Sequence, residues 1–338
     1  METYSLRLTQ SLSETVDLDV ITLPGHVDGT PPSSSQLLLF PFRVIAAFFG
    51  RQTRPDVVHV GDLAIWPLGW LASVYFRSPT IVISAHGTDV SYWRRRTIRG
   101  NLYGLYLRLG ARLLRNARVI ANSSATHNVL KQSGWTTEKI VRLATDMKRG
   151  PAVKGTRRTL LFCGRVLKMK GCAWFVDEVL PLLPDDIRLR IAGTIWEETD
   201  AHVLDHPRVD FLGHLDKNRL AQAYRDAMCV IVPNIEVRTG EYEGFGLVAT
   251  EAAAAGGVIL AADRDGLIDA VVDGVTGFLV ESGNPDAWAS KILEVSNWTD
   301  EHRAIFIERA SLTAAREYSW DRVAGETLEV YRNAMAEG

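Results

Sequence analysis

The chain has 338 residues, of which 46% are hydrophobic and 23% charged, and its formal net charge is −2. This length suits two domains, and this composition suits a globular protein. The sequence contains no uncharged apolar run of about 18 residues and no basic-then-apolar opening segment, so neither a membrane-spanning helix nor a signal peptide is expected.

The charge is unevenly distributed along the chain. Residues 1–150 carry 18 Lys and Arg against 10 Asp and Glu, whereas residues 151–338 carry 20 against 30. The N-terminal half is therefore expected to meet an anionic partner more readily than the C-terminal half.

The N-terminal half alternates helical and strand patterns. The expected strands are residues 16–23, 56–60, 80–84 and 119–124, and the expected helices are residues 2–16, residues 37–50 and a segment near Ala125. Residues 24–36, rich in Gly, Pro and Ser, are expected to form a loop. Such alternation predicts a doubly wound parallel sheet, in which ligands bind at the carboxyl ends of the strands.

His86 and Gly87 directly follow the strand expected at residues 80–84. A histidine at this end of a parallel strand can reach a ligand, although a lone histidine is more often structural. His59 has a similar position at the end of an earlier strand, and we rank it below His86.

Residues 92–118 contain eight arginines and no acidic residue. A 4-3-4 spacing predicts one apolar helix face, made of Leu102, Tyr106, Leu109 and Leu113, with Arg108, Arg112 and Arg115 nearly opposite. One interpretation is a helix that lies on an anionic membrane surface through Arg94–Arg118, near a lipid-linked acceptor. The other is a domain helix packed by its leucines, with a solvated basic face. Nucleic-acid binding is disfavoured because no matching motif accompanies the charge.

The second half repeats the alternation after a linker expected at residues 147–158. The first expected strand begins near Thr159, and the others are residues 188–192, 209–213, 229–233, 257–261 and 273–280. Two helices are expected at residues 220–227 and 247–255. A third is capped by Asn284, and a fourth starts near Ser319. This organisation predicts two domains, residues 1–150 and 151–320, and a terminal helix over residues 321–338.

Two stretches of the second half carry the chemistry. Gly244, Phe245 and Gly246 form a loop at the start of the helix expected at 247–255, where unpaired N–H groups and the helix dipole favour an anion. Glu243 and Glu251 frame this loop, and carboxylates suit sugar hydroxyls. The combination favours a nucleotide sugar, the alternative being an ordinary helix after a loop.

The second stretch supplies two cations after the strand that begins near Thr159. Arg165 offers a planar fork for phosphate oxygens, and Lys170, followed by Gly171, offers a point charge. Two cations near the start of a helix are what a departing diphosphate needs.

These paired motifs, Arg165-x4-Lys170-Gly171 followed by Glu243-x7-Glu251, resemble those of the retaining GT-B glycosyltransferases of family 4. The resemblance runs from about residue 2 to the C-terminus. It implies an α/β fold of two Rossmann-like, doubly wound domains facing a cleft, with the terminal helix crossing back to the N-terminal domain.

The resemblance also implies a reaction. A hexosyltransferase of this family moves a hexose from UDP- or GDP-hexose, with retention, to a saccharide or lipid-linked acceptor in cell-envelope glycan synthesis. We expect a cytoplasmic protein, at most peripheral on the inner face of the membrane, with no metal or other cofactor. The three cysteines form no CxxC pair, which agrees with a reducing compartment and with the absence of a zinc site.

The resemblance to the family implies roles for the residues of this chain that match the family motifs. The implied catalytic residues are His86, Arg165, Lys170 and Glu243, and the implied donor-binding residues are Arg165, Lys170, Gly213, Glu243, Gly244, Phe245, Gly246, Leu247 and Glu251. In these roles Arg165 and Lys170 neutralise the diphosphate, Glu243 contacts the sugar and Glu251 contacts the ribose. Gly213 would lie beside the base, which is read largely by backbone atoms.

The start of the chain departs from the family pattern. Family members open with a strand and a Gly-Gly loop, whereas Met1 already corresponds to the helix that follows them. We therefore expect a missing first strand and a late start or truncation. If the protein does begin at Met1, we expect the N-terminal domain to be weakly stable. Other hypotheses stay open: an inactive nucleotide-sugar-binding or membrane-associated partner protein, or another GT-B enzyme such as a nucleotide-sugar epimerase. A dehydrogenase is rejected because no G-x-G-x-x-G follows a first strand.

Overall fold

The computed structural model describes residues 2–23, 33–51, 53–77, 79–95, 97–151 and 158–337. The chain forms two compact units: unit 1 contains residues 1–141 and 320–338, and unit 2 contains residues 142–319. The division therefore falls earlier in the chain than the expected boundary at residue 150, and the terminal helix belongs to unit 1. Of the expected linker, residues 152–157 lie outside the described residues.

Unit 1 is built on a four-stranded parallel sheet with the order β1-β2-β3-β4. Its strands are β1 (Val57–Val60), β2 (Thr80–Ala85), β3 (Arg118–Ala121) and β4 (Thr137–Ile140). Strands β2 and β3 are almost entirely buried, as expected for a parallel sheet that is covered on both faces. Strand β4 was not predicted because its sequence, Thr-Glu-Lys-Ile, contains no apolar run. Within the described residues, β1 pairs with β2 alone.

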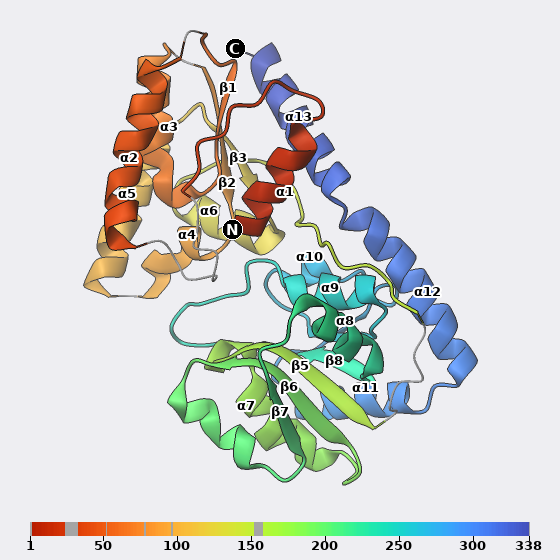
Figure 1. The fold of residues 1–338 in the computed structure, drawn as a ribbon. Coiled ribbons are helices and arrows are strands. Elements are labelled where there is room, and N and C mark those ends of the chain that lie inside the picture. Colours follow the sequence, from red (N-terminus) through yellow and green to blue (C-terminus); the bar gives the residue numbers. More distant parts are fainter. Residues whose placement is uncertain are drawn as a thin grey trace. The chain divides into compact units, whose positions relative to one another are not determined.

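Helices cover both faces of this sheet. They are α1 (Glu2–Leu12), α2 (Ser34–Phe49), α3 (Trp66–Tyr75), α4 (Thr88–Ser91), α5 (Ile98–Leu113), α6 (Ser124–Gln132) and α13 (Trp320–Ala336), with 3₁₀ turns η1 (Leu63–Ile65) and η2 (Tyr92–Arg95). Helices α1 and α13 pack against each other on one side, whereas α2, α3 and α5 lie on the other (Figure 1). The crossovers β1-α3-β2 and β2-α5-β3 run in the same direction along the sheet, which puts both helices on one face.

The strand predicted at residues 16–23 is wrong. Helix α1 ends at Leu12, and residues 17–23 belong to no strand. Val20, one of the alternating apolar residues of this segment, is exposed, so the segment does not gain the side-chain packing that stabilises a strand. Most of the loop expected after it, residues 24–32, lies outside the described residues.

Unit 2 is built on a six-stranded parallel sheet with the order β10-β9-β8-β5-β6-β7. The strands are β5 (Thr159–Val166), β6 (Arg188–Ile195), β7 (Val209–Gly213), β8 (Cys229–Val232), β9 (Ile259–Ala262) and β10 (Phe278–Val280). The chain adds β6 and β7 on one side of β5, and then β8, β9 and β10 on its other side. The strand order therefore reverses between β5 and β8, which is where open parallel sheets bind ligands.

The sequence predicts some of the helices of unit 2 and misses others. They are α7 (Cys172–Trp174), α8 (Lys217–Asp226), α9 (Leu247–Ala255), α10 (Leu267–Ala270), α11 (Pro285–Ser296) and α12 (Asp300–Glu317), with helical turns η3 (Lys168–Lys170), η4 (Phe175–Val179), η5 (Leu180–Leu182) and η6 (Glu198–Asp205). The predicted bounds of α9 and the Asn284 cap of α11 are confirmed. Helices α7, α10 and α12 were not predicted, although a Thr299 cap marks α12.

Candidate functional site

The candidate site lies at the reversal point of the unit 2 sheet. Strand β5 leads into η3 and Lys170, and β8 leads through Asn234 into the loop before α9. Because all six strands are parallel, these segments emerge at the same edge of the sheet. The fold therefore brings together the two motifs that lie about 70 residues apart in the sequence.

Lys170 is held in place by the glycine that follows it. Gly171 has φ +69°, and a Cβ at this position would lie 1.9 Å from the carbonyl oxygen of Pro233. The amide of Ile235 donates to the carbonyl of Met169 at 3.1 Å, which ties η3 to the end of β8. Only glycine allows this close approach, and Lys170, the residue before it, reaches Glu243 in the loop before α9.

Lys170 forms an ion pair with Glu243, whose carboxylate also accepts from Asn234 Nδ2 at 3.2 Å. The side chains of Lys170 and Glu243 are only 17% and 15% exposed. Burial alone would raise the pKa of Glu243, but the charge and hydrogen bond of Lys170, together with Asn234, hold it below its usual value. Glu243 is therefore an ionised acceptor at neutral pH.

The loop before α9 is shaped by close backbone contacts. Gly246 caps α9 with φ +100°, and a Cβ there would lie 2.4 Å from Leu267. The amide of Gly266 donates to the carbonyl of Glu243 at 2.9 Å. Phe245 is buried against Tyr318, so its side chain serves the core and only its backbone can meet a ligand. Leu247 begins α9, whose first-turn N–H groups point out of the helix.

Glu251 lies one helical turn into α9, beside residues that the sequence did not single out. Tyr224 donates its hydroxyl to Glu251 at 3.3 Å and lies 3.5 Å from Cys163 Sγ. Burial raises the pKa of Glu251, although the Tyr224 hydrogen bond and Lys217 oppose the rise. Among the described residues, the Tyr224 hydroxyl is the side chain that donates to the Glu251 carboxylate. A carboxylate can accept several hydrogen bonds, so Glu251 can also accept from a ligand.

Arg165 and Gly213 lie at the same edge of the sheet but outside the Lys170–Glu243 cluster. The exposed guanidinium of Arg165 stacks on Trp196, 4.5 Å from the ring centre, although its charge still helps to lower the pKa of Glu243. Gly213 ends β7 with φ +65°, and a Cβ there would meet open space. Trp196, exposed at the end of β6, was not predicted because only the fold brings it to Arg165.

In unit 1, His86 follows β2 and lies in a loop that Asp89 organises. The Asp89 carboxylate accepts from the amides of His86, Gly87 and Leu63 at 2.7–3.2 Å. The His86 ring lies 3.2 Å from the Gly61 carbonyl and meets Tyr4 edge-on. Burial lowers the pKa of His86 to about 4, so the imidazole is neutral at pH 7. Asp89 was not predicted as the residue that holds this loop.

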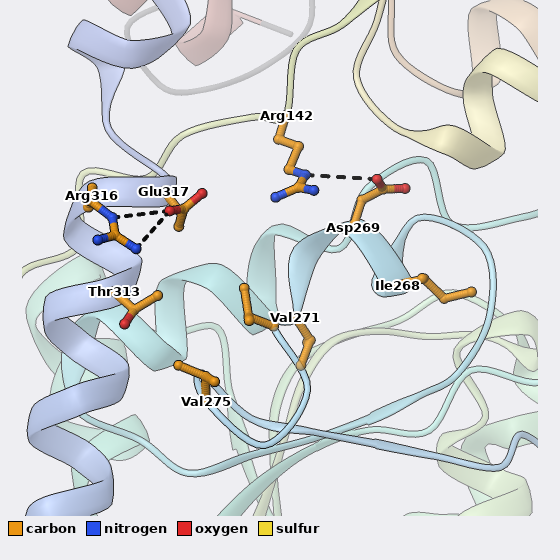
Figure 2. Close-up of a pocket in the computed structure, with 9 residues that line it drawn as sticks. Arg142, Ile268, Asp269, Val271, Val275, Thr313, Arg316 and Glu317 are labelled. Carbon is orange, nitrogen blue, oxygen red and sulfur yellow. Dashed lines mark hydrogen bonds and ion pairs between the residues drawn. The ribbon is translucent and has the colours of Figure 1, made fainter.

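A separate pocket of about 520 Å³ lies in unit 2 (Figure 2). It is lined by Arg142, Ile268, Asp269, Val271, Val272, Val275, Thr313, Arg316 and Glu317. Arg142 faces Asp269 at 3.9 Å, and Arg316 faces Glu317 at 3.1 Å. None of the residues of the two sequence motifs lines this pocket, so we do not assign the site to it.

Two further kinds of feature are absent from the described residues. None of their helices is long and apolar enough to cross a membrane. Over the same residues, no group of three or more His, Cys, Asp or Glu side chains is arranged to hold a metal ion.

Comparisons with known proteins agree with this architecture. Sucrose-phosphate synthase from Thermosynechococcus elongatus has a TM-score of 0.72 at 20% identity, over 99% of this chain and 94% of that one. Anabaena HepE in complex with UDP-glucose has a TM-score of 0.67 at 20% identity, over 96% and 88%. Together with the two parallel-sheet units, these similarities define the GT-B fold.

The family follows from both halves of the sequence. The family described as Glycosyltransferase Family 4 matches residues 2–144, and Glycosyl transferases group 1 matches residues 157–297. The chain belongs to the group 1 glycosyltransferases of family 4, as the motifs indicated.

Curated relatives include two D-inositol 3-phosphate glycosyltransferases. The protein from Xylanimonas cellulosilytica is 35% identical over 52% of this chain and 42% of its own length. The one from Streptomyces avermitilis is 27% identical over 99% of this chain and 79% of its own length. An uncharacterised glycosyltransferase of Methanocaldococcus jannaschii is 30% identical over 56% and 48%. The chain thus matches less than half of the length of two of these three relatives.

Proposed function

We propose that this protein transfers a hexose from a nucleoside-diphosphate sugar, UDP- or GDP-linked, to a hydroxyl of a saccharide or lipid-linked acceptor, with retention at the anomeric carbon. Synthesis of cell-envelope glycans is the process that uses such acceptors. The relatives whose names specify glycosyl transfer, and the HepE complexes with UDP and UDP-glucose, support a nucleotide-sugar donor.

The observation that carries the proposal is the cluster of Lys170, Glu243 and Asn234 at the reversal point of the unit 2 sheet. It combines a cation with an ionised carboxylate beside the start of α9. A nucleotide sugar joins an anionic diphosphate, which suits the cation, to a polyhydroxylated sugar, which suits the carboxylate. In the free protein the two side chains satisfy each other, and a bound donor would give each of them a further partner.

In the proposed reaction the bond between the anomeric carbon and the diphosphate oxygen breaks, and a bond from the acceptor oxygen forms on the same face of the sugar. The acceptor proton passes to the departing phosphate oxygen, so no protein base is required. Lys170, Arg165 and the first-turn amides of α9 would stabilise the negative charge that develops on the diphosphate. The reaction as written needs neither a metal nor another cofactor.

The carboxylates and the histidine have distinct proposed roles. Glu243, ionised because of Lys170, accepts hydrogen bonds from the sugar. Glu251 accepts from the ribose, where ligand hydroxyls would offset the cost of its burial. His86 is assigned to the donor sugar on the family motif, and its lowered pKa makes it a neutral hydrogen-bonding group rather than a cation.

The test is calorimetric binding and product analysis with a panel of UDP- and GDP-hexoses. We expect one donor to bind and to be hydrolysed slowly without an acceptor, with release of the nucleoside diphosphate. Glu243→Gln should keep the fold and weaken binding of the sugar nucleotide more than binding of the free nucleotide. Absence of binding by any donor, in a sample whose unfolding is cooperative, would contradict the proposal.

A further inference from the structure

More than half of the exposed large apolar side chains of the described residues lie on three helices of unit 1, α2, α3 and α5. On α5 they are Ile98 (81% exposed), Leu102 (62%), Leu105 (61%), Leu109 (48%) and Leu113 (45%). The apolar face of α5 is thus turned to solvent. The interpretation of this segment as a helix packed by its leucines is wrong.

Glycines explain this orientation of α5. Its buried positions are Gly100, Gly104, Leu107 and Gly110. A Cβ at Gly110 would lie 2.7 Å from Trp66 and 2.8 Å from Trp135, and a Cβ at Gly104 would lie 3.2 Å from Trp93. The helix therefore lays its glycine face against these aromatic rings. Tyr106, predicted to share the leucine face, instead donates its hydroxyl to the Ala64 carbonyl at 2.5 Å.

The exposed face of α5 is amphipathic in a particular way. At about 100° per residue, its five exposed apolar side chains fall within an arc of roughly 80°. The exposed Arg108 and Arg112 border this arc on one side, and the exposed Arg99 lies on the other. The arginines thus flank the apolar stripe. The sequence had suggested that they lie opposite it.

Helices α2 and α3 extend the stripe into a surface. On α2, Leu38, Leu39, Phe42 and Phe49 are 59–74% exposed, while Val44 and Phe48 face inward. Phe49 contacts Tyr75 of α3 with ring centres 5.3 Å apart, and α3 also packs against α5. We call these three helices the α2/α3/α5 surface; the exposed large apolar residues on them are Leu37, Leu38, Leu39, Phe42, Phe49, Trp70, Val74, Tyr75, Ile98, Leu102, Leu105, Leu109 and Leu113.

The segments that form this surface carry charge of one sign. Residues 33–51, 63–77 and 92–118 contain no Asp or Glu and eleven arginines. Arg43, Arg99, Arg108 and Arg112 are exposed on α2 and α5. An apolar face bordered by arginines, with Trp70 and Tyr75 among its aromatics, matches the chemistry of an interface with anionic lipid.

We infer that the α2/α3/α5 surface docks on an anionic lipid bilayer, with the apolar side chains inserted at the level of the headgroups and the flanking arginines paired with lipid phosphates. This inference stands on unit 1 alone and is independent of the proposed reaction. A second copy of the chain is the poorer occupant, since a symmetric contact would set two arginine-bordered faces that lack carboxylates against each other.

The experiment is flotation of the full chain with vesicles of phosphatidylcholine alone or mixed with phosphatidylglycerol. We expect the protein to float with the mixed vesicles and to float weakly with phosphatidylcholine alone. High salt should weaken the binding without abolishing it, because the apolar part is not screened. Each comparison uses the full chain, and size-exclusion chromatography of the same samples reports self-association.

Two double variants separate the apolar and the charged contributions. Leu105→Ser with Leu109→Ser should lower the vesicle partition coefficient about tenfold or more, and Arg108→Gln with Arg112→Gln should lower it about tenfold. The matched controls are Ile305→Ser with Leu312→Ser, exposed on α12, and Arg219→Gln with Arg332→Gln, exposed on α8 and α13. All of these side chains are solvent-exposed, so the thermal unfolding of the variants should match that of the parent chain.

Three outcomes would overturn the inference. The first is no flotation with the mixed vesicles at low salt. The second is flotation that the leucine pair leaves unchanged, or that the α12 control reduces equally. The third is a concentration-dependent dimer that the leucine pair converts to monomer without any change in vesicle binding, which would assign the surface to a second copy.

Discussion

The two units each bury a polar cluster beside a parallel sheet, but the clusters are built on opposite principles. In unit 2 the cluster is an ion pair, Lys170 with Glu243. In unit 1 it is a chain of neutral groups: His59 lies 2.6 Å from the Tyr331 hydroxyl and 2.8 Å from the Ser84 hydroxyl, which in turn lies 3.0 Å from Tyr4.

The difference explains why we interpret the buried His59 as a structural residue. Both ring nitrogens of His59 are occupied within unit 1, and they link β1 and β2 to α13. Burial lowers the pKa of His59 to about 4 and raises that of Tyr4 to about 12, so both are neutral at pH 7. The His59 cluster links elements of unit 1, whereas the charged pair of unit 2 retains the capacity to act on an anionic ligand.

The largest effect is expected when a substitution breaks the charged cluster of Lys170 and Glu243. Lys170→Ala removes a cation from the diphosphate and leaves Glu243 buried without its partner, so we expect turnover to fall about 10²–10³-fold. Steady-state kinetics with the donor identified by the binding panel measure the loss. The control is Lys168→Ala, which removes an exposed lysine from the same helical turn. Equal turnover in both variants would remove Lys170 from the site.

The next largest effect is expected from a substitution of Gly171, whose backbone packs closely against Pro233 beside Lys170. Gly171→Ala forces a Cβ against the Pro233 carbonyl in a left-handed conformation, and we expect a loss of unfolding free energy of about 3 kcal/mol together with reduced turnover. Gly283→Ala is the matched control, because Gly283 has φ +76° and a Cβ there would meet open space, so only the conformational cost of about 1 kcal/mol remains. Denaturant unfolding of both variants measures the difference. Equal losses would show that the contact with Pro233 relaxes freely.

The neutral cluster should make unit 1 sensitive to acid. The unfolded chain protonates His59 near pH 6.5, but the folded chain does so only near pH 4. The unfolded state therefore binds more protons between these values, and His59 alone lowers stability by about 2 kcal/mol between pH 7 and pH 5. His86, whose pKa burial also lowers to about 4, adds a fall of the same sign. Urea unfolding at the two pH values measures this change.

His59→Gln should lower stability at pH 7 and flatten its dependence on pH. The control is His202→Gln in unit 2, since a backbone carbonyl at Thr199 and the Asp177 carboxylate raise the pKa of His202, which gives a pH dependence of opposite sign. A pH dependence of stability that is unchanged by His59→Gln would assign the acid sensitivity to other groups.

The smallest effect concerns the ribose end of the proposed site. Because burial raises the pKa of Glu251, nucleotide affinity should fall as acid protonates this carboxylate. Glu251→Gln should lower the affinity for UDP or GDP about tenfold at pH 7 and remove the acid-side decline. Calorimetric titrations across the pH range measure both, with Tyr224→Phe as a milder variant. An unaltered pH profile would exclude Glu251 as the acceptor.

The sequence predicted those parts of the site that are local in the chain. The helix over residues 247–255, its glycine-rich start and Glu243 and Glu251 follow from one continuous stretch, because caps, glycines and strong helix formers act on their neighbours. Asn234, Tyr224 and Trp196 were not predicted. Each reaches the site from a different strand or helix, and no short motif records such a contact.

The orientation of α5 could not be read from its hydrophobic pattern for a different reason. Leucines at 4-3-4 spacing ordinarily face the core, and only the close approach of Gly104 and Gly110 to tryptophan rings reverses that preference. The glycine spacing was visible in the sequence, but its meaning depends on Trp66, Trp93 and Trp135, which lie on other elements.

Unit 1 is assembled from two separated stretches of the chain, and this has a consequence for synthesis on the ribosome. Residues 142–319 of unit 2 are continuous and can fold as soon as they have emerged. Unit 1 receives α13, with the Tyr331 hydroxyl that meets His59, only after all of unit 2 has been translated. Until then its first 141 residues lack α13, and the side of α1 that packs against α13 is uncovered.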